Sequence, residues 1–269
     1  MKILTVKMFV MDNTKNIVIT GSQGLIGSHT VKKLLENGYK VTSIDIKSNN
    51  IEAKPSNNFT HFTCDILDEE KLKVALSQSQ EKFGPIKGLV NCAALDFIPN
   101  KKSDHNLENF DIKNFSNIFN INVSAQILVS KLVAENMISQ KIQGSIIFIN
   151  SIYGIVSPNQ HIYDHIKLDS GESYKKPIEY SASKSSLTNI VKYLSTYLGV
   201  NNIRVNGIVF GGIENNQDSN FIENYSSMTP LSRMANISET FGPIKFLLSE
   251  ESSYVTGTNL VVDGGWTAW

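Results

Sequence analysis

The sequence has few cysteines, no excess of charge of either sign and no long hydrophobic run. Cys64 and Cys92 are its only cysteines, which leaves no disulfide framework and no metal-ligand spacing. Lys plus Arg and Asp plus Glu both number 25, for a formal net charge of zero, so no basic surface indicates nucleic acid or an anionic membrane as partner. No apolar segment approaches the ~20 residues that span a bilayer. These features favour a reducing, cytoplasmic compartment and indicate no metal site.

Hydrophobic residues make up 41% of the 269 positions, enough for a sizeable core. No repeat, low-complexity tract or linker divides the chain. We interpret residues 1–15 as an N-terminal extension, since Lys7 interrupts their apolar pattern and no signal-peptide cleavage site follows. Residues 16–269 are then expected to form one catalytic domain.

Short apolar, β-branched runs alternate with helical patterns along the whole chain. The predicted strands are 16–20, 40–45, 59–64, 86–91, 145–150, 203–210 and 259–263. The predicted helices are 24–37, 68–83, 115–140, 180–199 and 238–249. Near-continuous apolar strands of this kind indicate a parallel sheet covered on both faces. The expected fold class is therefore α/β, a single doubly wound domain.

The turn after the first predicted strand contains three glycines that open a helix. Gly21 permits a tight turn, Gly24 lets the backbone approach a pyrophosphate, and Gly27 allows close helix–strand packing. The free N–H groups of the helix then face the phosphates. This pattern predicts a dinucleotide site.

An acidic residue at the end of the second predicted strand indicates which dinucleotide binds. Asp45 lies 18 positions after Gly27, where a carboxylate accepts from the ribose hydroxyls and repels a 2′-phosphate. NAD is therefore favoured over NADP, with Lys47 the one nearby cation that could weaken this preference. Asp65, after the third strand, either binds the adenine amine or caps the next turn.

Tyr180 and Lys184 form a pair separated by one helical turn. Side chains at i and i+4 share a helix face, and a cation there lowers the pKa of a tyrosine. The tyrosine can then exchange a proton with a carbonyl or an alcohol. Taken alone, a Tyr-x-x-x-Lys pair is common and proves nothing.

The segments YSASK and IRVNGIVFGG closely resemble the short-chain dehydrogenase/reductase family. The long insert before YSASK, with SIYG ahead of it, resembles the family's oxidoreductases of flagellin modification and nonulosonic-acid pathways. TGSQGLIG, the NCAA run, NINVS, INSIYG and VDGG support the family resemblance over most of the chain. It implies a Rossmann-type domain with a seven-stranded parallel sheet, an NAD-dependent enzyme acting on CH–OH groups, and a homodimer or homotetramer. The implied catalytic residues are Asn122, Ser151, Tyr180 and Lys184. The implied cofactor contacts are Gly21, Gln23, Gly24, Leu25, Ile26, Asp45, Asp65, Ile66, Asn91, Ala93, Tyr180, Lys184, Gly211 and Ile213.

A second Tyr-x-x-x-Lys pair, Tyr163 and Lys167, competes with the first. It begins 12 residues after Ser151, close to the family's usual separation, whereas Tyr180 lies 29 residues after it. We prefer Tyr180 because small residues follow it and its helix leads into IRVN at the family's usual distance. The sequence also departs from the family in its glycine spacing, in NCAA for NNAG, and in Phe210–Gly211 for Pro-Gly.

The insert 155–179 between Ser151 and Tyr180 is polar and aromatic, and we expect it to lie over the substrate. Together with the resemblance, it indicates a sugar or nucleotide-sugar as substrate. A 3-oxoacyl-carrier-protein-type reductase is the alternative, although the balanced charge offers no basic docking patch. A catalytically idle NAD-binding regulator is a third interpretation. The presence of all four implied catalytic residues argues against it.

Overall fold

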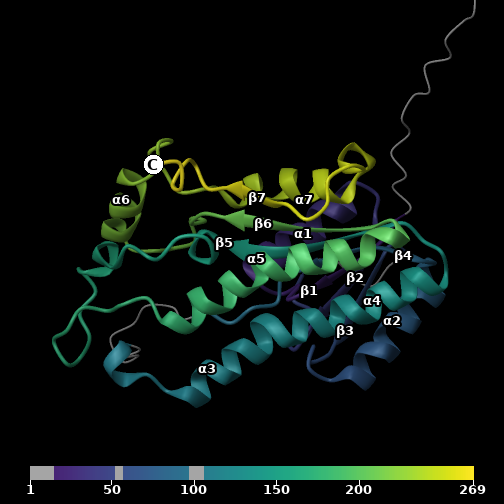
Figure 1. Cartoon of the computed structure of the whole chain (residues 1–269), viewed down its shortest axis with the longest axis horizontal. Coiled ribbons are helices and arrows are strands. Elements are labelled where there is room, and N and C mark those ends of the chain that lie inside the picture. Colours follow the sequence, from purple (N-terminus) through teal and green to yellow (C-terminus); the bar gives the residue numbers. More distant parts are fainter. Residues whose placement is uncertain (1–14, 52–56, 97–105) are drawn as a thin grey trace, which may run out of the picture.

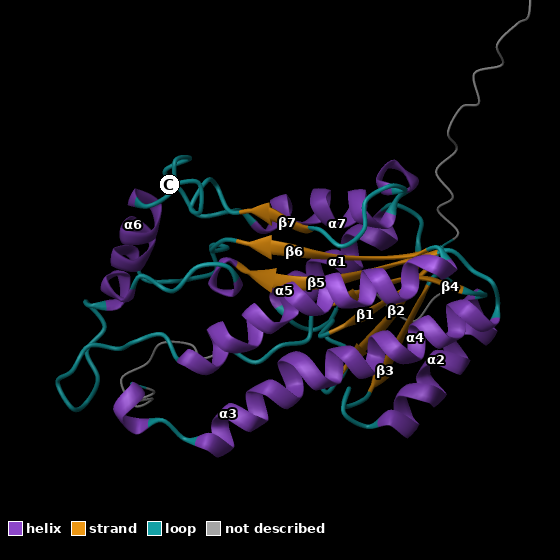
Figure 2. Ribbon diagram, in the orientation of Figure 1, coloured by secondary structure: helices purple, strands orange, loops and turns teal. Residues whose placement is uncertain are grey.

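The computed structural model describes residues 15–51, 57–96 and 106–269. They form one seven-stranded sheet in the order β3-β2-β1-β4-β5-β6-β7, with every neighbouring pair parallel (Figures 1 and 2). The strands are β1 Asn16–Thr20, β2 Lys40–Asp45, β3 Phe59–Thr63, β4 Ile86–Asn91, β5 Gly144–Ser151, β6 Ile203–Phe210 and β7 Asn259–Val262. The predicted fold class is confirmed, and each strand lies within one residue of its predicted bounds.

Helices cover both faces of the sheet. They are α1 Leu25–Glu36, α2 Glu69–Phe83, α3 Ile112–Phe119, α4 Gln126–Ser139, α5 Ile178–Leu198, α6 Ser219–Ser227 and α7 Phe241–Leu248. The predicted helix 115–140 is three elements, because a π-helical turn over Asn120–Ala125 separates α3 from α4. The predicted helix 238–249 is shorter, since a 3₁₀ turn over Ile237–Thr240 precedes α7. Helix α6 was not predicted, because its short polar sequence SNFIENYSS reads as a loop.

Gly38 lies just beyond the end of α1. Its φ of +81° places it in the left-handed region that glycine adopts without strain. The N–H groups of Gly38 and Tyr39 donate to the carbonyls of Leu35 and Leu34, which satisfies the end of the helix. The chain therefore enters β2 after a tight turn and leaves Asp45 level with the end of β1.

Two apolar cores lie on opposite faces of the sheet. The buried residues of α2, α4 and α5 pack on one face, represented by Leu76, Val133 and Leu187. Those of α1 and α7 pack on the other, represented by Leu34 and Leu247. Because both faces are covered, the strands present apolar side chains on both sides, which explains their near-continuous hydrophobic runs.

A third buried cluster lies beyond the carboxyl ends of β5 and β6, on the side of the insert and α6 (Figure 1). Tyr163 and Tyr174 of the insert are fully buried and meet edge-to-face, with ring centroids 5.5 Å apart. Tyr163 also packs on Phe221 of α6, and Tyr225 of the same helix stacks on Trp266. The insert therefore packs beside the carboxyl edge of the sheet through its buried aromatic side chains.

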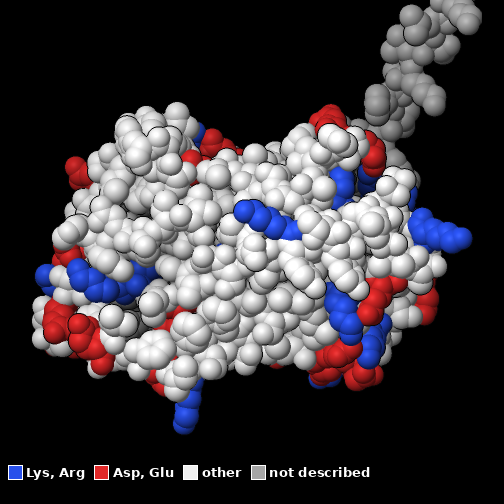
Figure 3. Space-filling view, viewed as in Figure 1, with Lys and Arg blue, Asp and Glu red and all other residues white. Residues whose placement is uncertain are grey.

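The outer face of α4 and α5 carries few charged side chains, which gather instead toward the two ends of the molecule (Figure 3). Exposed aromatic and aliphatic residues lie on these two helices, among them Ile127, Tyr193 and Tyr197. The two tyrosines stack on each other with ring centroids 6.3 Å apart. Among the described helices, none is long and apolar enough to cross a membrane.

Candidate active site

The predicted site residues gather at the carboxyl edge of the sheet. Gly21 follows β1, Asp45 ends β2, Asn91 ends β4, Ser151 ends β5 and Gly211 follows β6. The strand order reverses between β1 and β4, and such switch points are where ligands bind in doubly wound sheets. The topology thus brings together residues that are spread over most of the chain.

The glycine turn leaves room that any side chain would fill. Gly21 has a φ of +61°, and a Cβ added there would lie 2.5 Å from the backbone of Ala93. Gly24 is the N-cap of α1, so no side chain occupies the helix N-terminus, and the first turn holds no acidic residue. Leu25 and Ile26 begin this helix. Free N–H groups and the positive end of the helix dipole are thus available to a phosphate group.

Asp45 is held in place by two backbone N–H groups. That of Gln23 donates to Oδ2 at 2.9 Å and that of Lys47 to Oδ1 at 3.0 Å. The residue is 8% exposed. Each carboxylate oxygen retains acceptor capacity, so the carboxylate can also receive the two hydroxyls of a ribose.

Asp65 takes the second of its two predicted roles in this structure. Its Oδ1 accepts the N–H of Leu67 at 2.9 Å, which caps the turn after β3. Ile66 is buried beside it. Binding of an adenine amine by Asp65 stays a prediction.

Asn91 carries an unsatisfied polar atom at the edge of the site. Its Nδ2 donates to Ser130 Oγ at 3.0 Å, whereas its Oδ1 is buried without a hydrogen-bond partner. The carbonyl of Ala93 accepts from Gln126 Nε2. Across the site, Gly211 follows β6 and Ile213 forms a bridge with Ala235. The glycine turn, the open helix N-terminus, Asp45 and this orphaned oxygen together suit a dinucleotide.

Tyr180 and Lys184 lie in the first two turns of α5. Ser151 forms a hydrogen bond with the tyrosine hydroxyl, and Lys184 Nζ lies 5.7 Å from the centre of the tyrosine ring. Lys184 is 4% exposed and donates from Nζ to the carbonyl of Ile149 at 2.9 Å. The three side chains therefore meet at the end of β5.

Burial opposes charge on both members of the pair. It raises the pKa of Tyr180, and the Asp96 carboxylate raises it further, whereas the hydrogen bond with Ser151 lowers it. Burial lowers the pKa of Lys184 to about 8, against the opposing effects of Asp96 and Cys92. A phenolate at Tyr180 consequently needs positive charge close by.

Asn122 lies in the π-helical turn between α3 and α4 and is fully buried. Its Nδ2 donates to the Leu95 carbonyl at 3.0 Å and to Ser183 Oγ at 3.1 Å, while its Oδ1 accepts from the Leu95 N–H at 2.7 Å. One amide thus fastens the segment after β4 to α5. π-helical turns often occur at functional sites, where they redirect one side chain.

The competing pair, Tyr163 and Lys167, does not share a helix face. The hydroxyl of Tyr163 lies 3.0 Å from that of Tyr153, inside the buried aromatic cluster. Lys167 is exposed and donates to Ser173 Oγ. Residues 160–163 form a single 3₁₀ turn, so the lysine is not carried back over the tyrosine.

The structure adds a charged pair that the sequence does not reveal. Lys176 is buried, and its Nζ lies 2.5 Å from Asp96 Oδ1 and 4.6 Å from the centre of the Tyr180 ring. The two residues are 80 positions apart, and Lys176 precedes α5, so no periodic pattern links them. Only the return of the insert to the sheet edge brings them together.

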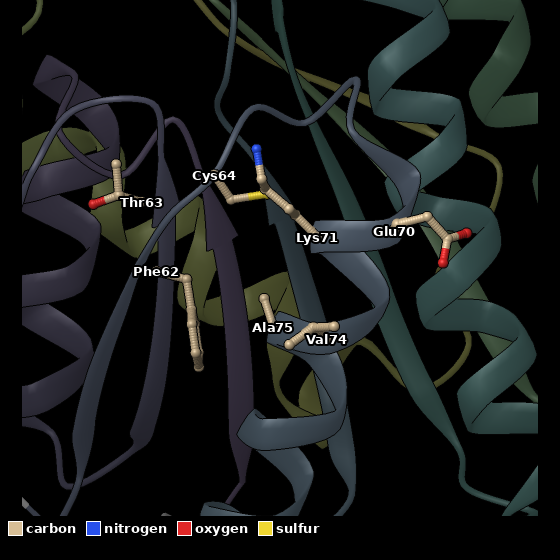
Figure 4. A pocket seen from close by; sticks show the side chains of 7 residues that line it. All are labelled: Phe62, Thr63, Cys64, Glu70, Lys71, Val74 and Ala75. Atoms are coloured by element: carbon tan, nitrogen blue, oxygen red, sulfur yellow. The ribbon is translucent and has the colours of Figure 1, made fainter.

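A surface hollow between β3 and α2 is separate from this site (Figure 4). It is lined by Phe62, Thr63, Cys64, Glu70, Lys71, Val74 and Ala75. None of these is a predicted site residue. Within residues 15–51, 57–96 and 106–269, no group of three or more His, Cys, Asp and Glu side chains is arranged to hold a metal ion.

A parallel doubly wound sheet with this glycine turn and a Tyr–Lys pair at its carboxyl edge defines a class of dinucleotide-dependent oxidoreductases. The family described as short chain dehydrogenase matches residues 15–164, and the one described as Enoyl-(Acyl carrier protein) reductase matches residues 168–267. The chain belongs to the short-chain dehydrogenase/reductase family, as the sequence motifs indicate. It is an oxidoreductase whose similar proteins include dehydrogenases acting on alcohol groups.

Individual similar proteins differ in what their names say they do. Post-translational flagellin modification protein A of Campylobacter coli is 30% identical, over 95% of this chain and 99% of that protein. A 7alpha-hydroxysteroid dehydrogenase of Bacteroides fragilis is 29% identical, over 94% of each chain. A short chain dehydrogenase of Leptospira borgpetersenii, solved with bound NAD+, is 32% identical with a TM-score of 0.82, over 94% of this chain and 92% of that one.

Gly21→Ala should lower dinucleotide affinity at least tenfold and reduce the melting temperature. The new methyl group would meet the backbone of Ala93 at 2.5 Å, in a backbone conformation that disfavours alanine. Titration calorimetry and thermal unfolding measure the two effects. Gly242→Ala is the control, because a Cβ at this helical glycine meets nothing within 4 Å and alanine favours helices. Equal binding by the two variants would contradict this account of the turn.

Proposed function

We propose that the protein is an NAD-dependent oxidoreductase that interconverts an alcohol and a ketone, with Tyr180 as the acid/base. The observation that carries the proposal is the meeting of Ser151, Tyr180 and Lys184 at the carboxyl edge, beside the open N-terminus of α1. The dinucleotide would be held by the glycine turn, Asp45 and Lys184, and would supply or accept a hydride. Side chains of the protein would transfer the proton, position the substrate oxygen and stabilise the charge that develops.

Tyr180 would donate the proton from its hydroxyl to a carbonyl oxygen, or take one from an alcohol. Ser151 would steady the same substrate oxygen through its Oγ. Lys184 would stabilise the phenolate, and its ammonium could exchange the Ile149 carbonyl for the ribose hydroxyls of the nicotinamide nucleotide. Asn122 would keep the segment after β4 against α5, and in the resembling enzymes this residue holds a water molecule that connects the lysine to solvent.

Asp45 is the basis for proposing NAD over NADP. Its carboxylate is fixed at the end of β2 by two N–H donors, so it cannot easily turn away from a 2′-phosphate. We propose further that the protein acts in a reducing, cytoplasmic compartment, since Cys64 and Cys92 are both free thiols.

NADH should bind at least tenfold more tightly than NADPH, a difference of about 1.4 kcal/mol. The physical reason is repulsion between Asp45 and the 2′-phosphate. Titration calorimetry with the two reduced cofactors measures the ratio. Asp45→Asn should bring the ratio of the NADPH and NADH dissociation constants closer to one, because the amide carries no charge to repel the 2′-phosphate. Equal affinities in the unaltered protein would contradict the proposal.

Tyr180→Phe should reduce turnover by about a hundredfold or more while leaving NADH binding intact, because it removes the proton donor and keeps the ring. Steady-state kinetics and cofactor titration separate the two effects. Tyr163→Phe is the matched comparison and should cost far less turnover, since the Tyr163 hydroxyl bonds Tyr153. A larger loss at Tyr163 would mean that the acid/base is misassigned.

The proposed substrate is a sugar or nucleotide-sugar of a surface-glycan or flagellin-modification pathway. Support comes from the flagellin-modification relative and from the polar groups of the insert, where Asn159, His161 and Asp164 lie at least partly exposed. Such groups suit several hydrogen bonds to hydroxyls. The alternative is a 3-oxoacyl-carrier-protein-type reductase. The family description that matches residues 168–267 names an acyl carrier protein and favours a substrate of that kind.

A panel of nucleotide-sugars, free sugars and a 3-oxoacyl thioester distinguishes these substrates. Formation or loss of NADH absorbance reports turnover in either direction. Preferred turnover of a nucleotide-sugar or sugar would support the proposal. Preferred reduction of the 3-oxo group of the acyl thioester would favour the alternative. If NADH binds and no compound in a wide panel turns over, a regulator that uses NAD as a signal becomes the better account.

We propose that the protein assembles as a homodimer or homotetramer through α4 and α5. Their outer face carries the stacked pair Tyr193 and Tyr197 and few charges (Figure 3), and closed symmetric assemblies are the common outcome for such surfaces.

The double variant Tyr193→Glu/Tyr197→Glu should yield monomers, because like charges would face each other across a two-fold axis. Multi-angle light scattering at micromolar concentration measures the mass. The unaltered protein should give two or four times the chain mass of 29.9 kDa. A stable monomer before any substitution would rule out the assembly.

A further inference from the structure

The end of the insert brings a second lysine to the ring of Tyr180. Lys176 Nζ lies 4.6 Å from the ring centre, nearer than Lys184 Nζ at 5.7 Å. The Lys176 side chain is 7% exposed, and its ammonium pairs with Asp96 Oδ1 at 2.5 Å. Two cations therefore lie close to one tyrosine ring, and only Lys184 belongs to the Tyr-x-x-x-Lys motif.

The backbone of Lys176 is fixed by contacts inside the insert. Gln160 Oε1 accepts the Lys176 N–H at 2.8 Å, and Gln160 Nε2 donates to the Lys176 carbonyl at 3.3 Å. Pro177 follows as the N-cap of α5, and a residue before proline is restricted to extended backbone. The lysine is thus held at a defined distance from the helix that carries Tyr180.

Positive charge over this ring opposes the effects that disfavour a phenolate. The charge of a phenolate spreads into its ring, and a partly buried cation on the ring face stabilises it. Burial and the Asp96 carboxylate both raise the pKa of Tyr180. The charged or titratable groups around Tyr180 are Asp96 and Cys92 after β4, Tyr153 after β5, and Lys176 and Lys184 close to the ring.

We propose that Lys176 is a positioning residue that stabilises the phenolate form of Tyr180, with Asp96 as its counter-charge. The inference rests on the proposed role of Tyr180 as acid/base. In this arrangement Lys176 cancels the repulsion between Asp96 and the phenolate, and the insert supplies electrostatic control that the motif alone does not contain. Because the insert binds Lys176 through Gln160, movement of the insert would change the basicity of Tyr180.

Ultraviolet titration of tyrosinate in the presence of saturating NAD+ tests this without any substrate. Each protein is compared with its own Tyr180→Phe version, so that the difference isolates one tyrosine. Lys176→Met keeps the length of the side chain and removes its charge. It should move the difference titration to higher pH by on the order of one unit, a tenfold change in acid dissociation.

The double variant Asp96→Asn/Lys176→Met should titrate closer to the unaltered protein, because the carboxylate charge that raises the pKa of Tyr180 is then removed together with the lysine charge. A loss of packing alone would show no such recovery. Lys175→Met is the matched control: its Nζ pairs with Asp164 at 3.0 Å on the surface of the same insert, and its titration should coincide with that of the unaltered protein. Identical titrations for Lys176→Met and the unaltered protein, or an equal shift in Lys175→Met, would overturn the proposal.

Asp96→Asn alone provides a second test if Lys176→Met does not fold. It keeps the cation and removes the anion, so the Tyr180 titration should move to lower pH. An unchanged or higher value would overturn the proposal. Failure to turn over any sugar would count against the proposed substrate alone, since the titration requires none, whereas full activity in Tyr180→Phe would remove Tyr180 as the acid/base.

Discussion

All seven strands run in the same direction, and the rest of the structure depends on this constraint. Parallel pairing places every carboxyl end at one edge, so residues as distant as Gly21 and Gly211 become neighbours of one site. It also requires a crossover between strands, which supplies the helices that bury both faces. The reversal of strand order between β1 and β4 lies next to the N-terminus of α1, and doubly wound sheets bind ligands at such switch points.

At this edge of the sheet, desolvation and charge act against each other. Burial raises the pKa of Tyr180, which is partly buried, and lowers the pKa of Lys184 to about 8. A buried lysine is costly unless its ammonium has partners. The carbonyl of Ile149 serves Lys184 and the carboxylate of Asp96 serves Lys176. The acid–base properties of the site therefore belong to a group of charges, of which the Tyr–Lys motif is one part.

The insert between Ser151 and Tyr180 is packed against the rest of the molecule beside the carboxyl edge of the sheet. Its aromatic residues join α6 and Trp266 in a buried cluster, and the Tyr163 hydroxyl is occupied by Tyr153. That packing explains why a second Tyr-x-x-x-Lys pair at a plausible distance from Ser151 takes a structural position. Lys176, whose backbone the insert holds, is the residue through which the insert brings a cation to the Tyr180 ring.

The sequence by itself determined the strands, the glycine turn, the position of Asp45 at the end of a strand and the placement of Tyr180 and Lys184 on one helix, because each depends on local spacing or on a short motif. Helix α6 and the π-helical turn at Asn122 were not predicted, since their sequences resemble a loop and an ordinary helix. For Asp65 the sequence left two roles open, binding of the adenine amine and capping of the next turn, and the structure shows the cap. The pairing of Asp96 with Lys176 was decided only by tertiary structure, since it joins residues 80 positions apart. Contacts of this kind arise when parallel strands bring their following loops to one edge, and no periodicity in the chain encodes them.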